Sequence, residues 1–187
     1  MYVFDKQLGV HEKAVSSVKF SPDGRYVASA SADKMVHVYD VESGNHTVLD
    51  GKHKQGLNDV VWVPGHNGLY LAVCSDDRTI SLWDVQLGKV VHSFTGHKGF
   101  VFCLARHPRN GLLLSGSYDG TVRLWDARIR KSISSIEAHS EPVTSVHFRG
   151  EGSPPGEGMS YSGWEDQFVS GGADGVCTSS SGSGGGL

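Results

Sequence analysis

The chain alternates short apolar runs with turns, and this alternation predicts β-strands almost throughout. The clearest case is the run LLLSGSYDGTVRLWD at residues 112–126, in which two apolar stretches flank Tyr118-Asp119-Gly120. An Asp-Gly pair between alternating apolar residues is a strong signal for a β-hairpin. Similar runs predict a four-stranded sheet near the N-terminus, with strands close to residues 15–20, 26–29, 35–39 and 46–49.

The same pattern recurs along the chain with a nearly fixed period. His11, His53, His97 and His139 are 42, 44 and 42 residues apart. In three repeats an aspartate lies six residues before an aromatic residue that is itself followed by aspartate; the pairs are Asp33–Tyr39, Asp77–Trp83 and Asp119–Trp125. A period of about 40–45 residues with Gly-His and Trp-Asp signatures is typical of a propeller blade. The chain therefore resembles the WD-repeat (WD40) family.

This resemblance predicts an all-β fold of about four propeller blades, of which the fourth is incomplete. Propellers have about 4–8 blades, and rings of this family usually have seven, so we expect an open arc. We divide the chain into an N-terminal stub (residues 1–10), four repeats (11–50, 51–94, 95–137 and 138–177) and a flexible Gly/Ser tail (178–187).

The fourth repeat departs from the others. His139 and Asp174 are 35 residues apart, whereas 22 residues separate His97 from Asp119. The excess indicates an insertion in a surface turn between Arg149 and Glu165, and no Trp-Asp follows Asp174. Uncovered flanks would promote self-association through the open blade edges. The apolar residues that we expect there are Val15, Val18, Val27, Val143, Val146 and Phe168.

Composition narrows the function classes only slightly. The net charge of −3 in 187 residues gives no general attraction to nucleic acid. No apolar stretch reaches transmembrane length and the N-terminus has no secretory pattern. We therefore expect an intracellular protein, nuclear and/or cytoplasmic. Cys74, Cys103 and Cys177 lack paired spacing, which indicates buried thiols in a reducing compartment.

The repeated polar residues indicate a structural network. By resemblance to the family, His97, Ser115, Asp119 and Trp125 form a hydrogen-bonded chain within one blade. A partly buried aspartate needs donors, and both imidazole and indole N–H groups can supply them. The remaining members are His11, Ser29, Asp33 and Tyr39 in repeat one, His53, Asp77 and Trp83 in repeat two, and His139, Ser170 and Asp174 in repeat four. Repeat two lacks the hydroxyl, because Val73 replaces the serine, and repeat four lacks the aromatic residue.

A His-Ser-Asp set could also suggest a catalytic triad. Because the set recurs in several repeats, it fits a scaffold better than a single active site. The sequence has no G-x-S-x-G elbow, no H-E-x-x-H, no paired Cys-x-x-Cys and no phosphate-binding G-x-x-x-x-G-K motif. We expect no enzyme activity, no metal and no cofactor.

Several stretches resemble one subfamily more closely. The segments HEKAVSSVKFSPDGRYVASASADK, SDDRTISLWDV, GHKGFVFCLARHP and SEPVTSVHF are similar to the first four blades of the adaptor in COMPASS/trithorax-type histone lysine methyltransferase complexes. That resemblance implies a chromatin scaffold whose narrow face binds an arginine side chain of a partner peptide. The matching positions are Ala14, Ser16, Ala32, Asn58, Asp76, Phe102, Tyr118, Thr144 and Ala173.

Phe102 matches one of two aromatic residues that sandwich the arginine in that family. Cation–π stacking would favour this role, but an ordinary packing role in the inner strand is an equal alternative. Two departures weaken the match: the second sandwich residue would lie in a later blade, and Ala173 replaces a larger aromatic residue. The competing functions are a ubiquitin-ligase substrate receptor that reads phosphorylated peptides, or a non-functional truncated propeller.

Overall fold

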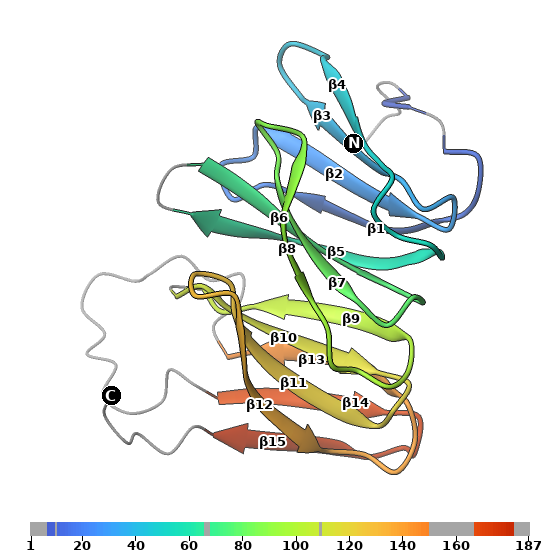
Figure 1. Cartoon of the computed structure of the whole chain (residues 1–187), viewed down its shortest axis with the longest axis vertical. Coiled ribbons are helices and arrows are strands. Elements are labelled where there is room, and N and C mark those ends of the chain that lie inside the picture. Colours follow the sequence, from blue (N-terminus) through green and yellow to red (C-terminus); the bar gives the residue numbers. More distant parts are fainter. Residues whose placement is uncertain (1–6, 10, 66–67, 109, 150–166, 182–187) are drawn as a thin grey trace, which may run out of the picture.

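The fold consists of antiparallel strands arranged in four sheets. A computed structural model describes residues 7–9, 11–65, 68–108, 110–149 and 167–181 (Figure 1). Across these residues there are fifteen strands and no helix, so none of them forms a helix that could cross a membrane. Blade 1 contains β1 (Val15–Phe20), β2 (Tyr26–Ser31), β3 (Val36–Asp40) and β4 (His46–Leu49). Blade 2 contains β5 (Leu57–Gly65), β6 (Gly68–Ser75), β7 (Ile80–Asp84) and β8 (Lys89–Phe94).

Blade 3 contains β9 (Val101–Arg106), β10 (Leu112–Ser117), β11 (Thr121–Asp126) and β12 (Lys131–Glu137). Blade 4 has three strands among the described residues, namely β13 (Val143–Phe148), β14 (Gln167–Gly172) and β15 (Cys177–Ser181). The complete antiparallel sheets predicted for repeats one to three are confirmed. Residues 178–181 belong to β15, so the flexible tail that we expected from residue 178 does not begin there. The insertion expected in repeat four falls almost wholly outside the described residues.

The four sheets pack face to face in sequence order and do not close into a ring. The innermost strands β1, β5, β9 and β13 contact one another in that order, and Figure 1 shows the sheets stacked from blade 1 to blade 4. An apolar cluster fills each of the three junctions between neighbouring blades. The open arc predicted from the repeat count is therefore confirmed.

The two faces of each sheet serve different junctions, because side chains alternate along a strand. Leu113 and Trp125 are paired across β10 and β11 and pack toward blade 2, whereas Leu114 and Val122 pack toward blade 4. Trp125 is 2% exposed and its ring lies 5.4 Å from that of Phe94 on β8. Each Trp-Asp aromatic residue thus seals the junction with the preceding blade.

The apolar residues expected on uncovered flanks divide into two groups. Val15 and Val18 are exposed, as predicted. Val143, Val146 and Phe168 are buried, so our prediction for them is wrong. Their side chains point toward blade 3, where they join Cys103 and Leu114 in one cluster, and not toward the outer side of blade 4. Val27 is also buried.

Asp59, on the innermost strand of blade 2, ties three blades together. Its Oδ1 accepts a hydrogen bond of 2.7 Å from the Ser17 hydroxyl on β1 and one from its neighbour's backbone, Val60 N–H. Its Oδ2 accepts a hydrogen bond of 2.9 Å from Leu104 N–H on β9. This carboxylate therefore fixes the positions of β1 and β9 relative to β5.

Candidate peptide-binding face

The residues proposed for peptide binding occupy equivalent positions in the four blades. In each blade the residue after the second strand donates its N–H to a carbonyl just before the innermost strand. These bonds are Ala32 to Ala14 at 3.0 Å, Asp76 to Gly56 at 3.0 Å, Tyr118 to Phe100 at 2.8 Å and Ala173 to Pro142 at 2.9 Å. All of these residues therefore lie at the end of the arc where the innermost strands begin, which we call the entry face.

Polar contacts hold the entry face of blades 1 and 2 in place. Asn58 Nδ2 donates to Asp76 Oδ1 at 2.7 Å and to the Val101 carbonyl at 2.9 Å. Asn58 thus connects the Asp76 carboxylate to the start of β9. The Ser16 hydroxyl lies within hydrogen-bonding distance of the Ala30 and Leu57 carbonyls, at 3.0 and 2.7 Å, so it contributes to the junction between blades 1 and 2.

Three aromatic rings form a cluster on the entry face of blade 3. The ring centroids of Phe100, Phe102 and Tyr118 are 5.9–6.4 Å apart, and both neighbours meet Phe102 at steep interplanar angles of 68° and 77°. Phe100 and Tyr118 are exposed, and Phe102 is half-buried between the buried residues Val101 and Cys103. We call these three residues the aromatic corner.

Phe100 was missed in the sequence analysis, although a signal for it existed. It occupies the position in blade 3 that Ala14 occupies in blade 1, and Ala14 was named as a candidate. Blade 4 contributes smaller side chains to the entry face. Thr144 is exposed and its hydroxyl donates to the Gly171 carbonyl at 3.2 Å, and Ala173 is exposed.

The predicted polar residues of blade 3 form a directed chain of hydrogen bonds. Trp125 Nε1–H donates to Ser115 Oγ at 2.8 Å, and Ser115 Oγ lies 2.7 Å from His97 Nε2. His97 Nδ1 lies 3.1 Å from Asp119 Oδ2. With Ser115 donating to Nε2, a neutral imidazole carries its proton on Nδ1 and donates it to the carboxylate. Every member then has a partner.

The aspartate also closes the turn that carries it. Asp119 accepts hydrogen bonds from Lys98 N–H at 2.7 Å, from Thr121 N–H at 3.0 Å and from the Thr121 hydroxyl at 2.6 Å. Burial raises the pKa of Asp119, but these hydrogen bonds lower it more, and the net pKa lies well below its ordinary value. The carboxylate therefore stays charged and keeps both the turn and the histidine in place.

Repeat two does contain the hydroxyl that the sequence analysis found missing. Ser81 on β7 lies opposite Val73, and its Oγ is 2.6 Å from His53 Nε2 and accepts a 2.7 Å hydrogen bond from Trp83 Nε1–H. His53 Nδ1 in turn lies 2.9 Å from Asp77 Oδ2. In blade 2 the hydroxyl therefore comes from β7 and not from β6, and only the register between these two strands shows this.

Blade 4 replaces the missing indole donor with a hydroxyl. Thr178 Oγ1 lies 2.7 Å from Ser170 Oγ, and Ser170 Oγ lies 3.0 Å from His139 Nε2. His139 Nδ1 lies 3.1 Å from the Asp174 carboxylate. The position of the aromatic residue itself is taken by Ser180, which pairs with Phe168 as Trp125 pairs with Leu113.

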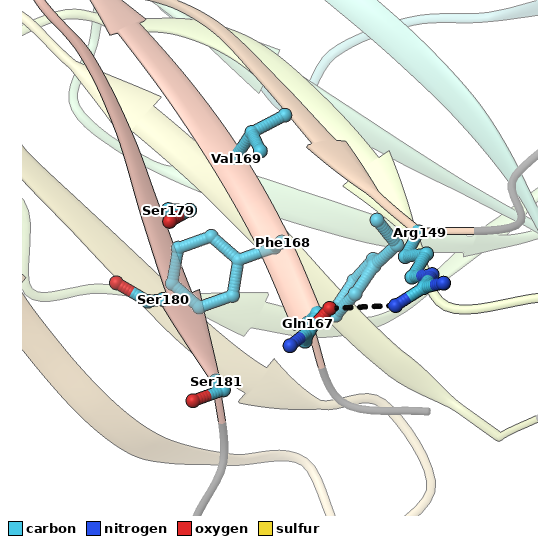
Figure 2. A pocket seen from close by; sticks show the side chains of 8 residues that line it. Arg149, Gln167, Phe168, Val169, Ser179, Ser180 and Ser181 are labelled. Atoms are coloured by element: carbon cyan, nitrogen blue, oxygen red, sulfur yellow. Dashed lines mark hydrogen bonds between the residues drawn. The ribbon is translucent and has the colours of Figure 1, made fainter. Parts of the chain in front are cut away.

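A pocket of about 350 Å³ opens beside these strands of blade 4. Figure 2 shows Phe168 directed toward Ser179 and Ser180, and Arg149 hydrogen-bonded to Gln167 at the start of β14. The lining is mainly serine hydroxyls and phenylalanine rings. Charged groups that could orient a specific ligand are few, so the entry face remains the stronger candidate for binding.

Blade 1 combines the expected chain with a column of rings. His11 Nδ1 lies 2.8 Å from Asp33 Oδ2, and His11 Nε2 lies 2.8 Å from Ser29 Oγ. The Tyr39 hydroxyl, which we expected to replace the indole, lies 2.9 Å from His37 Nδ1. The His37 ring stacks on His11 with centroids 3.9 Å apart. Burial lowers the pKa of His37, and the two neighbouring histidines, His11 and His46, lower it further.

These histidines make folding stability depend on pH. Burial also lowers the pKa of His53 and His97 in spite of their aspartate partners. Because the unfolded chain then binds protons more readily than the folded one, the free energy of unfolding is expected to fall as the pH drops below about 6.5. Urea denaturation at several pH values between about 7.5 and 5 tests this. A free energy of unfolding that stays constant or rises toward acidic pH would contradict the neutral-imidazole assignment.

The described part of the chain contains both metal-ligating residue types and free thiols. Its His, Cys, Asp and Glu residues do not gather into any group of three or more that could hold a metal ion. Cys74 and Cys103 are buried free thiols, as expected, and burial raises the pKa of Cys103 to about 12. Cys177 is exposed, so the expectation of a buried thiol is wrong there.

Comparison with known proteins assigns the family. The pattern of the WD domain, G-beta repeat family matches residues 4–40, 46–84 and 88–126. The chain therefore belongs to this WD-repeat family.

Individual relatives share parts of the chain. It is 28% identical to Topless-related protein 4 of Arabidopsis thaliana over 75% of its own length. It is 34% identical to WD repeat-containing protein 1 of Mus musculus over 50% of its length. It is 32% identical to the U5 small nuclear ribonucleoprotein 40 kDa protein of Dictyostelium discoideum over 91% of its length. The chain spans only 13%, 16% and 44% of these relatives, respectively.

Proposed function

We propose that the chain is a non-catalytic WD-repeat scaffold whose entry face binds a peptide through an arginine side chain, as a subunit of a histone methyltransferase complex in chromatin. The partners are then arginine-bearing peptides and other subunits of that complex, with no direct role for nucleic acid or membrane. Such a protein acts in the nucleus, with a cytoplasmic pool also compatible. We infer membership of the complex from the subfamily resemblance. We infer recognition of an arginine side chain from the residues of the entry face.

The observation that carries the proposal is the aromatic corner beside a carboxylate. Asn58 bonds both to Asp76 and to the backbone of Val101, which directly precedes Phe102 in the chain. The carboxylate and the backbone that leads into Phe102 therefore contact the same amide. A guanidinium can stack on an aromatic face and donate to a carboxylate at once, because it is planar and has five N–H donors.

The surrounding positions favour a cation over a phosphate. A phosphopeptide reader needs clustered arginine or lysine side chains that contact the phosphate oxygens. None of the candidate positions on the entry face is basic, and Asp76 is acidic.

Replacing Phe102 by alanine is expected to weaken binding of an arginine peptide by about 1–3 kcal/mol, since the change removes a stacking face and apolar area. Calorimetric titration measures the change. Ile129→Ala is the matched control, because Ile129 is similarly apolar and 59% exposed but lies between β11 and β12, at the opposite end of the blade. It should leave the affinity unchanged.

A peptide array separates the proposed function from its alternative. Arginine peptides should bind and phosphoserine peptides should not. Preference for phosphoserine peptides would instead indicate a substrate receptor of the ubiquitin-ligase type. Equal affinity of wild-type protein and Phe102→Ala, with the fold intact by circular dichroism, would leave Phe102 with a packing role only.

A further inference from the structure

One turn on the entry face is equivalent in all four blades. It contains the aspartate of the hydrogen-bonded chain, and the residue that follows this aspartate is Lys34, Arg78, Gly120 or Gly175. In every blade the N–H of that residue donates to the carbonyl three residues earlier, at 3.1–3.2 Å. The candidate peptide-binding position that comes directly after the second strand lies in the same turn, two residues earlier. The side chains of Lys34 and Arg78 therefore belong to the entry face.

Blades 1 and 2 place a cationic residue where the backbone favours glycine. The φ angles of Lys34, Arg78, Gly120 and Gly175 are all positive and lie between 70° and 78°. Glycine adopts this left-handed conformation freely, whereas a residue with a Cβ atom is strained in it. At Gly120 a side chain would also meet the His139 carbonyl oxygen, but the space around Gly175 is open. Strained residues of this kind gather at ligand-binding sites, which points to a role for Lys34 and Arg78.

Both cations are also without an anionic partner in the part of the chain that the structure describes. The side chains of Lys34 and Arg78 are exposed, and no described carboxylate forms an ion pair with either of them. At the opposite end of blade 1, by contrast, the exposed Arg25 is paired with Asp40 at 3.0 Å. The charges of Lys34 and Arg78 therefore remain available to an anionic group of a ligand.

The two turns lie beside each other and beside the proposed arginine site. A methyl group at Gly56 would lie 3.3 Å from Ala32 Cα, in the turn of Lys34, and 3.6 Å from Asp76 Oδ2, in the turn of Arg78. Asp76 is the carboxylate that we assign to the arginine of the peptide. The two cations therefore flank the arginine site on the side of blades 1 and 2.

The opposite side of the entry face lacks this positive charge. In blades 3 and 4 the equivalent turn positions are the uncharged Gly120 and Gly175. Two residues after the repeat histidine, blade 1 has Lys13 whereas blade 4 has Glu141, and both side chains are exposed. A bound peptide thus meets a more positive surface over blades 1 and 2 than over blades 3 and 4.

We propose that Lys34 and Arg78 bind carboxylate side chains close to the arginine of the partner peptide, so that the ligand is an arginine with acidic residues on one side. This inference rests on the proposed function, because it takes Asp76 as part of the arginine site. An extended peptide advances about 3.3–3.6 Å per residue, so aspartate or glutamate about two or three residues from the arginine would reach these turns.

The arrangement of the two cations favours carboxylates over other anions. Lys34 and Arg78 lie on separate turns, and each can meet a separate carboxylate. A phosphate reader gathers several arginine or lysine side chains around one group, and a nucleic acid needs a basic stripe that is longer than two turns. Short acidic segments of a peptide fit this pair of charges best.

Calorimetric titration of the whole chain with three peptides tests the inference. The first has an arginine with serine flanks, the second has two aspartates before the arginine, and the third has two aspartates after it. One of the two acidic peptides should bind about fivefold more tightly than the serine peptide, as expected for two exposed ion pairs. The gain should shrink at high salt, because salt screens exposed charges.

Glycine substitutions identify the residues responsible. The double variant Lys34→Gly and Arg78→Gly should fold normally, because blades 3 and 4 already carry glycine in this turn. It should lose the gain from the aspartates and keep the wild-type affinity for the serine peptide. Arg130→Gly is the matched control: Arg130 is exposed and also has a positive φ, of 57°, but it lies between β11 and β12 at the opposite end of blade 3. This variant should retain the full gain.

The outcomes separate this inference from the proposed function. If the serine peptide binds and its citrulline counterpart does not, the arginine site stands. Aspartates that give no gain on either side, or a gain that persists in the double variant, then overturn the carboxylate contact alone. A gain lost equally in Arg130→Gly also overturns it, because the effect would reflect overall charge. If none of the arginine peptides binds, the proposed function fails and this inference fails with it.

Discussion

Replacing Trp125 by alanine is expected to lower the free energy of unfolding by about 3–5 kcal/mol, the range observed for large aromatic side chains removed from protein cores. The indole is 2% exposed, it packs against Phe94 of blade 2, and it donates the hydrogen bond that starts the chain through Ser115. Its loss opens the junction between blades 2 and 3 and removes the donor to the Ser115 hydroxyl. Urea denaturation followed by far-ultraviolet circular dichroism measures the change.

Ile133→Ala provides the control for this substitution. Ile133 lies on β12 of the same blade and is 51% exposed, so its truncation should change the free energy of unfolding by less than about 0.5 kcal/mol. A similarly small effect for Trp125→Ala would mean that the Trp-Asp aromatic residue does not seal the junction between blades.

Replacing Asp59 by alanine should have the second largest effect, a loss of about 2–4 kcal/mol in the free energy of unfolding. Three donors from three strands, Ser17, Val60 and Leu104, converge on this carboxylate. Each donor left without a partner in a part-buried site costs about 1–3 kcal/mol, partly offset where water can enter. Chemical denaturation measures the total.

Asp59→Asn sharpens the test because it keeps the size of the side chain. An amide has one acceptor oxygen, and its NH₂ group would face a donor on either β1 or β9. We expect an intermediate loss of stability, and hydrogen exchange should show faster opening at one of these two strands. An alanine variant as stable as the wild type would show that the blades are held together without this carboxylate.

The repeat pattern was sufficient to predict the architecture. The spacing of His11, His53, His97 and His139 and the three Asp-to-aromatic pairs predicted strands and an open arc of blades. These features are visible in sequence because a fixed period and two-residue alternation follow directly from strand geometry. The aromatic residues of this pattern, Trp83 and Trp125, are buried in the structure.

Features that depend on register or on facing direction were not predictable. Ser81 supplies the hydroxyl of blade 2 from the opposite strand, which requires knowing that it pairs with Val73. Val143 and Phe168 were assigned to an exposed flank because the sequence shows alternation but not which face points inward. Ser180 and Thr178 extended the fourth sheet although their composition suggested a flexible tail.

On the entry face, the sequence identified positions but not their contacts. Phe102 and Tyr118 were named from resemblance, whereas Phe100, which completes the aromatic corner, appeared only in the structure. The bridge from Asn58 to both Asp76 and β9 joins residues 43 apart in the chain, and no local pattern reports it. Asp59 was likewise overlooked, although a carboxylate among the apolar residues of an inner strand signals an unusual role.

The most direct test of the account is a calorimetric comparison of two peptides that differ only in one side chain, arginine or its neutral isostere citrulline. Citrulline keeps the length and planar shape of arginine but carries no charge, so it loses both the cation–π attraction of the aromatic corner and the ion pair with Asp76. The account predicts that the arginine peptide binds and that citrulline weakens binding at least about tenfold, a difference that Phe102→Ala and Asp76→Asn each reduce. Equal affinity for the two peptides, in a protein whose fold is intact, would contradict the proposed arginine site.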